Sequence, residues 1–218
     1  MAGYHRYVFD IEGRRFVGDF ESMYRSEMTE AFDSWHQEDS RQLNRQVALS
    51  FFGTTNFGTV LDLGCGKGSL THQLKRRNNR VIGIDVSQTA VDVAQARFPD
   101  IEFTVHDVSR CNAIDPLVDK VLGPGSRFDL TVIAECLSYI ERWKEVLNEL
   151  AARSRFLIIT LYLPQDPIGF VKSRSDLLEA VQTSWDCIEV VTMEIGRFTI
   201  IFAQSKHREG EPPCQGMR

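Results

Sequence analysis

A glycine-rich turn constrains this 218-residue chain more than any other feature. Gly64, Gly66 and Gly68 stand at alternate positions directly after the short apolar strand expected at 60–63. Glycine permits tight turns and lets the backbone approach a ligand closely, as in the nucleotide sites of open α/β sheets. A helical pattern at 69–77 follows, which makes this a strand–turn–helix unit. We therefore expect a ligand at the carboxyl end of the strand at 60–63.

Strand and helix patterns alternate from residue 59 to about residue 203. We predict further strands at 80–85, 101–106, 127–134 and 156–163, and helices at 87–98, 140–152 and 173–183. Two more strand-like runs, 186–193 and 197–204, are separated by only three residues, which indicates a hairpin. The predicted fold class is α/β, with a mostly parallel sheet, helices on both faces and an antiparallel last strand.

The chain is expected to hold one domain and two appendages. Residues 59–204 form the core. Residues 1–58 form an N-terminal lid or appendage, in which Leu43, Val47 and Phe51 mark the helix face that docks on the core. Residues 205–218 include a run of Glu, Gly and Pro at 209–213 and are predicted to be a disordered tail.

Three aspartates stand near the carboxyl ends of consecutive predicted strands. In an open α/β sheet these strand ends share one edge, where ligands bind. Asp62 stands just before the glycine turn. Its carboxylate would repel a pyrophosphate but can receive an ammonium group. Asp85 lies about twenty positions beyond the turn, where an acid can accept both hydrogen bonds of a ribose diol. Asp107 follows the third strand and can accept a hydrogen bond from the amino group of adenine.

These segments resemble four motifs of the class I S-adenosylmethionine (SAM)-dependent methyltransferases. Residues 60–68 are similar to the glycine motif of that family, 83–87 to its acidic ribose motif, 107–108 to its adenine motif and 128–133 to its fourth strand. The resemblance covers about residues 59–204. It implies a Rossmann-like sheet of seven strands with a reversed last strand, SAM as methyl donor and S-adenosylhomocysteine as product. The residues assigned to the cofactor are Asp62, Gly64, Cys65, Gly66, Gly68, Asp85, Val86, Asp107, Val108 and Glu135.

The stretch 134–140 resembles a Glu-x-Leu-x-Tyr segment of some small-molecule methyltransferases, including the NodS-like sugar N-methyltransferases. Methyl transfer to a hydroxyl or an ammonium group requires a base that removes a proton. The predicted catalytic residues are Glu135, His36 and Tyr139, with His106 as a further candidate. Glu135 can instead cap the next helix, Tyr139 can belong to the core, and His36 can be a surface residue.

Aromatic residues of the N-terminal segment allow two interpretations. Tyr24, Phe32 and Trp35 can form a lid whose ring faces suit a sulfonium or ammonium group, or they can dock the appendage onto the core. In the other half of the chain, Tyr162 is expected to face the substrate after the fifth strand.

Composition restricts the class of partner. The chain has 30 acidic and 25 basic residues and a net charge of -5, which argues against a nucleic-acid partner. Its five cysteines are widely spaced and form no C-x-x-C pair, so neither a metal site nor a disulfide framework is expected. No apolar stretch is long enough to cross a bilayer, so we expect no membrane partner. We also expect the protein to be cytoplasmic and to be a monomer or a homodimer.

The sequence thus predicts a SAM-dependent methyltransferase that acts on a small molecule, such as a sugar, an amino sugar or another secondary metabolite, by O- or N-methylation. The alternatives are a protein or tRNA methyltransferase and a non-catalytic SAM-binding subunit. The segment 134–137 lacks the Asn-Pro-Pro-Tyr type of motif found where bases or glutamine are methylated. The G-x-G-x-G spacing and Asp62 argue against a dinucleotide-dependent oxidoreductase.

Overall fold

A computed structural model describes residues 5–30, 32–39, 41–194 and 197–207. Within these residues the main sheet has seven strands in the order β5-β4-β3-β6-β7-β9-β8. They are β3 (Thr59–Leu63), β4 (Arg80–Asp85), β5 (Glu102–Val105), β6 (Phe128–Ala134), β7 (Ser154–Tyr162), β8 (Trp185–Met193) and β9 (Phe198–Ser205). Strands β3 to β7 are parallel, whereas β9 is antiparallel to both of its neighbours. The predicted Rossmann-like α/β fold with an antiparallel last strand is confirmed.

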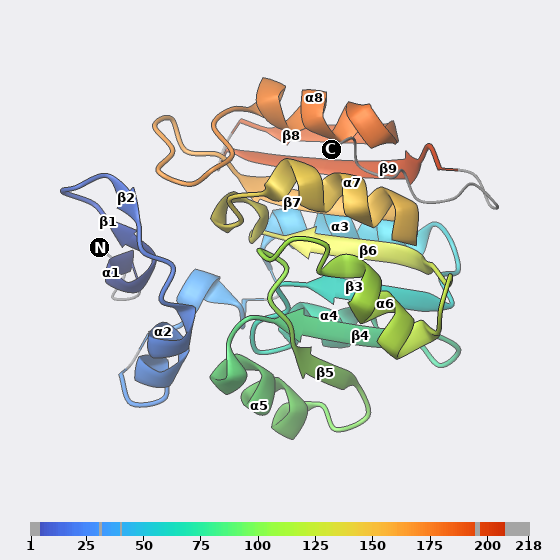
Figure 1. The fold of residues 1–218 in the computed structure, drawn as a ribbon. Coiled ribbons are helices and arrows are strands. Elements are labelled where there is room, and N and C mark those ends of the chain that lie inside the picture. Colours follow the sequence, from blue (N-terminus) through green and yellow to red (C-terminus); the bar gives the residue numbers. More distant parts are fainter. Residues whose placement is uncertain (1–4, 31, 40, 195–196, 208–218) are drawn as a thin grey trace.

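Helices cover both faces of the sheet (Figure 1). They are α3 (Leu43–Gly53) and α4 (Ser69–Leu74) on one face, α6 (Ile114–Leu122), α7 (Trp143–Arg153) and α8 (Arg174–Ser184) on the other, and α5 (Gln88–Arg97) against β4 and β5. The central strands are continuous apolar runs because both of their faces are buried, as β3 shows. Leu61 packs into the large core beneath α6 and α7, and Val60 packs into a second core with α3 and α4.

The N-terminal segment lies at the carboxyl ends of the parallel strands (Figure 1, blue). It contains α1 (His5–Val8), the hairpin strands β1 (Phe9–Asp10) and β2 (Arg15–Phe16), α2 (Phe20–Glu27) and the short helix η1 (Ser34–His36). The turn of this hairpin includes Glu12 and Gly13. This segment therefore lies over the edge of the sheet where a ligand was expected.

Two helix predictions need correction. The helix expected at 69–77 ends at Leu74, because the Asn79 side chain donates to the Leu74 carbonyl at 2.9 Å and accepts from the Arg76 amide at 2.7 Å. Helix α7 begins at Trp143, not at 140, because the short helix η2 (Leu137–Tyr139) comes first.

The docking face predicted for α3 was only partly right: Phe51 stacks on Phe202 of the core, with ring centroids 5.7 Å apart. Ala48 and Phe52 are buried, whereas Leu43 is 56% exposed. The buried face is rotated by one residue because it also carries the polar side chains of Asn44 and Arg45, which an apolar pattern does not reveal.

Helix α6 was not predicted at all, although its sequence holds the signal. Its buried residues Ile114, Leu117, Val118 and Val121 recur at helical spacing. At the other end of the chain, Ser205 belongs to β9, and the predicted tail at 208–218 lies outside the described residues. Within the described ranges, every helix is too short or too polar to cross a lipid bilayer.

Candidate cofactor and acceptor site

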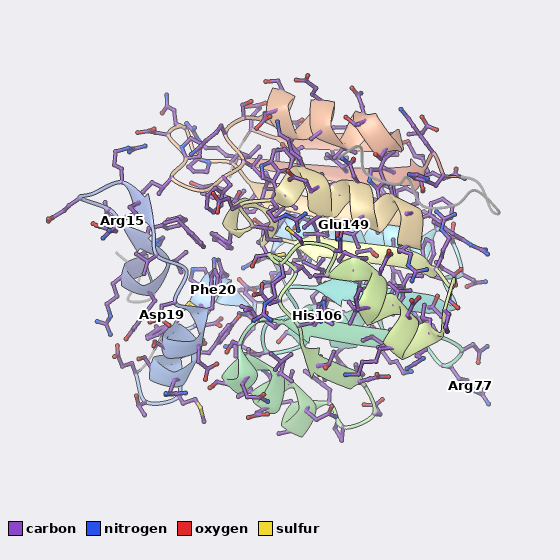
Figure 2. All side chains as sticks on the ribbon, viewed as in Figure 1. Arg15, Asp19, Phe20, Arg77, His106 and Glu149 are labelled. Atoms are coloured by element: carbon purple, nitrogen blue, oxygen red, sulfur yellow. The ribbon has the colours of Figure 1, made fainter. Side chains whose placement is uncertain are left out.

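A cavity of ≈ 450 Å³ opens at the carboxyl ends of β3, β4, β5 and β6. The sequence-predicted residues that line it are Asp62, Gly64, Cys65, Asp85, Val86, His106, Asp107, Val108, Glu135 and Tyr139. His106 and Phe20 of the N-terminal segment, both labelled in Figure 2, line this cavity. Arg77 stands at the opposite end of the molecule (Figure 2).

The glycine turn needs its glycines for steric reasons. Gly64 has φ = 77°, and a Cβ there would lie 2.6 Å from Sγ of Cys136, which also lines the cavity. Gly66 has φ = 53°, and a Cβ there would lie 2.3 Å from Oε1 of Gln37. Both positions combine a left-handed backbone with close neighbours, so the turn can exist only with glycine. Gly66 and Gly68 shape the turn but are not among the described residues that line the cavity.

Asp85 connects the turn to the second strand. Its Oδ2 accepts from the Gly66 amide at 2.9 Å, and its Oδ1 accepts from the Ser87 amide at 3.0 Å. Burial raises the pKa of Asp85, and these backbone donors oppose the rise. The carboxylate is thus held rigidly at the cavity wall.

Asp62 lies deeper, at the base of the turn. It is 1% exposed, and Oδ2 accepts from the Thr71 hydroxyl at 2.6 Å. Burial raises the pKa of Asp62 to about 6, because a charged carboxylate loses most of its hydration there. A cationic group in the cavity would favour the charged form.

Asp107 and Val108 form the wall beyond β5. Asp107 accepts from the Ser109 hydroxyl at 2.6 Å and from Nε of Arg110 at 3.2 Å. Partial burial raises the pKa of Asp107, but these bonds outweigh burial and the pKa lies below its usual value. Val108 is 8% exposed and adds an apolar surface.

Glu135 follows β6 in a strained conformation, with φ = 62°. Its Oε1 accepts from Thr160 at 2.6 Å and from Asn44 at 3.1 Å, and its Oε2 accepts from the Tyr162 amide at 2.7 Å. Burial raises the pKa of Glu135, and the three donors oppose the rise. This carboxylate therefore joins β6, β7 and α3 at the cavity.

Aromatic rings from separate segments form one end of the cavity. Tyr139 is central to them: its ring lies 5.5 Å from that of Phe20, and its hydroxyl accepts from Nε1 of Trp35 at 2.9 Å. Phe16 and Phe170 complete this aromatic roof, with ring centroids 5.2 Å apart. Among the other predicted aromatics, Tyr24 lines the cavity. Tyr162 is 46% exposed, and its ring is tilted against that of Phe198 with the centroids 5.6 Å apart.

Charged side chains anchor the N-terminal segment over the cavity. Nζ of Lys67, within the glycine turn, lies 2.5 Å from Glu27 and 3.0 Å from Asp33. Glu21 accepts from the hydroxyls of Ser87 and Thr89, both at 2.7 Å. The segment is thus bound to the turn and to the first residues of α5.

Two polar residues of the site escaped prediction. Gln37 accepts from the Lys67 amide at 2.9 Å and donates to the Tyr24 hydroxyl at 3.0 Å. Arg45 enters the cavity from α3 and is only 6% exposed. The apolar pattern of α3 gave no signal for Arg45, because the buried face of this helix also carries the polar Asn44. His36 is exposed and does not appear among the described residues that line the cavity.

Comparison with known proteins agrees with this geometry. Residues 60–155 match the family model described as "Methyltransferase domain". The chain is 31% identical over 135 residues to magnesium-protoporphyrin O-methyltransferase of Rhodobacter capsulatus, covering 58% of this chain and 55% of that protein. It spans about half of the length of the curated relatives it matches first, at 42% and 55%.

Solved structures share the fold at low sequence identity. The N-methyltransferase NodS from Bradyrhizobium japonicum WM9, in complex with S-adenosyl-L-homocysteine, has a TM-score of 0.68 and 16% identity, covering 86% of this chain and 98% of that one. The [4+2]-cyclase SpnF has a TM-score of 0.62 and 13% identity, covering 74% and 79%. The match to a cyclase shows that this fold does not by itself fix the reaction. The family match identifies residues 60–155 as a methyltransferase domain, and the fold around it is shared with solved methyltransferase structures.

Proposed function

We propose that this chain transfers a methyl group from SAM to a small molecule. The observation that carries the proposal is the convergence of the glycine turn, Asp62, Asp85 and Asp107 on one cavity of ≈ 450 Å³. This volume lies within the roughly 300–1,000 Å³ of small-molecule sites.

The residues of the cavity fit the parts of SAM. Asp85 would hold the ribose diol, Asp107 and Val108 the adenine, and Asp62 the ammonium group. The packed turn supports this fit, since a Cβ at Gly64 would fill space beside the cavity-lining Cys136. Bound SAM supplies an electrophilic methyl group on a positively charged sulfur.

The aromatic roof would hold the acceptor. Phe16, Phe20, Trp35, Tyr139 and Phe170 offer ring faces that exclude water and attract cationic groups. Alignment of the acceptor with the methyl group is then the main contribution of the chain to the rate. A sugar, an amino sugar or another secondary metabolite, methylated on oxygen or nitrogen, is the acceptor class we propose.

Glu135 is the residue that we propose takes the acceptor proton. Burial raises its pKa, which makes it a stronger base than an ordinary carboxylate, and three donors hold it in place. Tyr139 would line the acceptor end. His36 has no place in this scheme, because it is exposed and lies outside the lining described above.

The residues of the N-terminal segment would act as a lid in this proposal. They supply Phe16, Phe20 and Trp35 to the roof, and the ion pairs of Lys67 connect them to the cofactor turn. A lid so close to the cavity favours a small acceptor over a protein or a tRNA.

Calorimetric titration with SAM, S-adenosylhomocysteine and NAD tests the proposal. We expect binding of the first two and none of NAD. Amino sugars and hydroxylated metabolites would then be screened as acceptors, with methylated products detected by mass spectrometry. NAD binding, or no binding of either SAM or S-adenosylhomocysteine, would refute the proposed function.

A further inference from the structure

The aromatic roof offers ring faces to an acceptor but few hydrogen-bonding groups. The rings of Phe16 and Tyr139 lie nearly parallel, with 8° between their planes, and the ring of Phe170 meets that of Phe16 edge-on. The polar side-chain atoms of the roof are the Tyr139 hydroxyl and Nε1 of Trp35, and they bond to each other at 2.9 Å. Burying a polyhydroxylated body here would leave hydroxyls unpaired, which is costly. The roof therefore favours a flat, apolar body.

The charge of the cavity favours a cationic acceptor. Its lining includes five carboxylates, those of Asp62, Asp85, Asp107, Glu135 and Glu141. Among the described residues that line it, Arg45 is the one Lys or Arg side chain. Bound SAM would add one net positive charge, so the carboxylates would still outnumber the cations. A cationic acceptor is attracted to such a cavity, and an anionic acceptor is repelled from it.

Glu141 is the carboxylate at the mouth of the cavity. It follows η2 and lines the cavity, yet it is exposed to solvent. With the described residues it forms no ion pair and no side-chain hydrogen bond, whereas Glu135 is held by three donors. The charge of Glu141 is thus available to a group that enters from solvent.

We propose that the methyl acceptor is an amine on a flat apolar body, which enters past Glu141 as the ammonium ion and lies against the aromatic roof. Aromatic faces attract cations, and burial of the apolar body adds to the affinity. The inference rests on the proposed function and narrows its acceptor class, because the methyl group then goes to nitrogen and the acceptor is not a sugar.

Transfer to such an amine balances in protons and electrons. The ammonium ion gives one proton to the carboxylate of Glu135, which later passes it to solvent. The nitrogen lone pair then forms a bond to the methyl carbon, and the electron pair of the broken carbon–sulfur bond remains on sulfur. An alkylammonium ion has a pKa of about 10, against about 16 for water, so a carboxylate can deprotonate it far more easily than a hydroxyl.

Four probes separate the charge of the acceptor from its apolar body. 2-Phenylethylamine and 2-phenylethanol share a ring and differ in charge, 3-phenylpropionate carries the opposite charge, and glucosamine carries an amine without the ring. Each is titrated by calorimetry into the protein saturated with S-adenosylhomocysteine, so no turnover is needed. We expect 2-phenylethylamine to bind about 10-fold more tightly than 2-phenylethanol or glucosamine, and 3-phenylpropionate to bind more weakly still. With SAM, mass spectrometry should detect N-methyl-2-phenylethylamine.

Trp35 reports whether a probe lies under the roof. The chain has three tryptophans, and the other two, Trp143 and Trp185, are buried in the main core. 2-Phenylethylamine should therefore change the tryptophan fluorescence of the wild type but not that of Trp35→Phe, which keeps an aromatic face. The affinity of Trp35→Phe, measured by calorimetry, should stay within about threefold of the wild type.

Glu141→Gln tests the charge at the mouth. It should lower the preference for 2-phenylethylamine over 2-phenylethanol by about two- to fivefold, the range of an exposed ion pair. Glu145→Gln is the matched control, because Glu145 is exposed on α7 and is not among the described residues that line the cavity. Phe20→Leu removes one ring face of the roof and should weaken the amine more than the alcohol.

Each outcome supports or contradicts the acceptor class. Equal affinities for 2-phenylethylamine and 2-phenylethanol, tighter binding of glucosamine or 3-phenylpropionate, or no binding of any probe would overturn it and leave methyl transfer from SAM standing. A fluorescence change that persists in Trp35→Phe would place the probe outside the roof and overturn it as well. An undiminished preference in Glu141→Gln would remove Glu141 from acceptor binding. Failure to bind S-adenosylhomocysteine would instead overturn the proposed function itself. Melting temperatures show whether each variant is folded, and Glu141→Gln, at an exposed residue, still tests the charge if Phe20→Leu is not.

Discussion

The backbone amide of Gly66 donates a 2.9 Å hydrogen bond to Oδ2 of Asp85, which joins the glycine turn after β3 to the end of β4. The other oxygen of Asp85 accepts from the amide of Ser87, the residue that caps α5. One carboxylate therefore orders two backbone segments of the cavity and also faces the space between them. A ligand that binds Asp85 therefore contacts a carboxylate that the backbone of the protein already holds in place.

Replacing Asp85 should weaken cofactor binding. We expect Asp85→Ala to lose about 1–3 kcal/mol of SAM binding free energy, because a charged acceptor for the ribose is removed and two backbone donors lose their partner. Calorimetric titration measures the loss. Asp92→Ala, on the exposed surface of α5, is the control and should bind SAM as the wild type does. Equal affinities for the two variants would remove Asp85 from the ribose site.

Asp62 should make stability depend on pH. Burial raises its folded-state pKa from 3.8 to about 6, so its contribution to stability is complete below pH 3.8 and is lost as the pH rises through about 6. Asp62→Asn should therefore raise the free energy of unfolding at pH 8, by up to about 3 kcal/mol, and change it little at pH 3.5.

Urea unfolding at the two pH values measures this difference for Asp62→Asn. The same variant should bind SAM less tightly, because the acceptor for the ammonium group is lost. If the variant is no more stable than the wild type at pH 8, the charged carboxylate of Asp62 does not destabilise the folded protein.

Lys67 should decide how firmly the N-terminal segment is held. The side chains of Lys67 and Glu27 are only 13% and 8% exposed, and removing one partner of a buried ion pair leaves the other charge uncompensated. Lys67→Met should destabilise the protein by about 3–5 kcal/mol and speed amide hydrogen exchange in α2. Lys144→Gln breaks the exposed pair with Asp176 and should cost no more than about 1 kcal/mol. Unchanged exchange in α2 of Lys67→Met would show that this ion pair does not anchor the segment.

Glu21 should add an acid-sensitive contact between α2 and α5. Burial raises its pKa, but hydrogen bonds from Ser87 and Thr89 outweigh burial and lower the pKa to about 2. Its stabilising effect is therefore present above pH 4.5 and is lost as the pH falls towards 2.

Glu21→Gln should reduce this part of the pH dependence, as measured by thermal unfolding between pH 2 and pH 6. Glu12→Gln is the control, because Glu12 is exposed and lies in the hairpin turn. If both variants follow the wild-type profile, the contact from Glu21 contributes nothing measurable.

The sequence by itself determined the sheet, the turn and the acids at its edge. Alternating strand and helix patterns, the three glycines at 64–68 and the positions of Asp62, Asp85 and Asp107 predict a parallel sheet with a ligand site at its carboxyl edge. These signals are local: a periodic apolar pattern or a glycine after a strand depends only on near neighbours in the chain. The helical apolar pattern of α6 is local in the same way, so this helix could also have been predicted from the sequence.

Only the tertiary structure decided which distant residues meet at that edge. Arg45 and Gln37 enter the site through the packing of α3 and the segment before it, and His36, their neighbour in sequence, is exposed. The partners of Glu135 come from α3 and β7, as many as 91 residues away. Contacts of this kind depend on how the helices rotate and dock on the sheet. Successive positions of a helix point in different directions. A rotation of α3 by one residue therefore places Arg45 in the cavity and leaves Leu43 exposed.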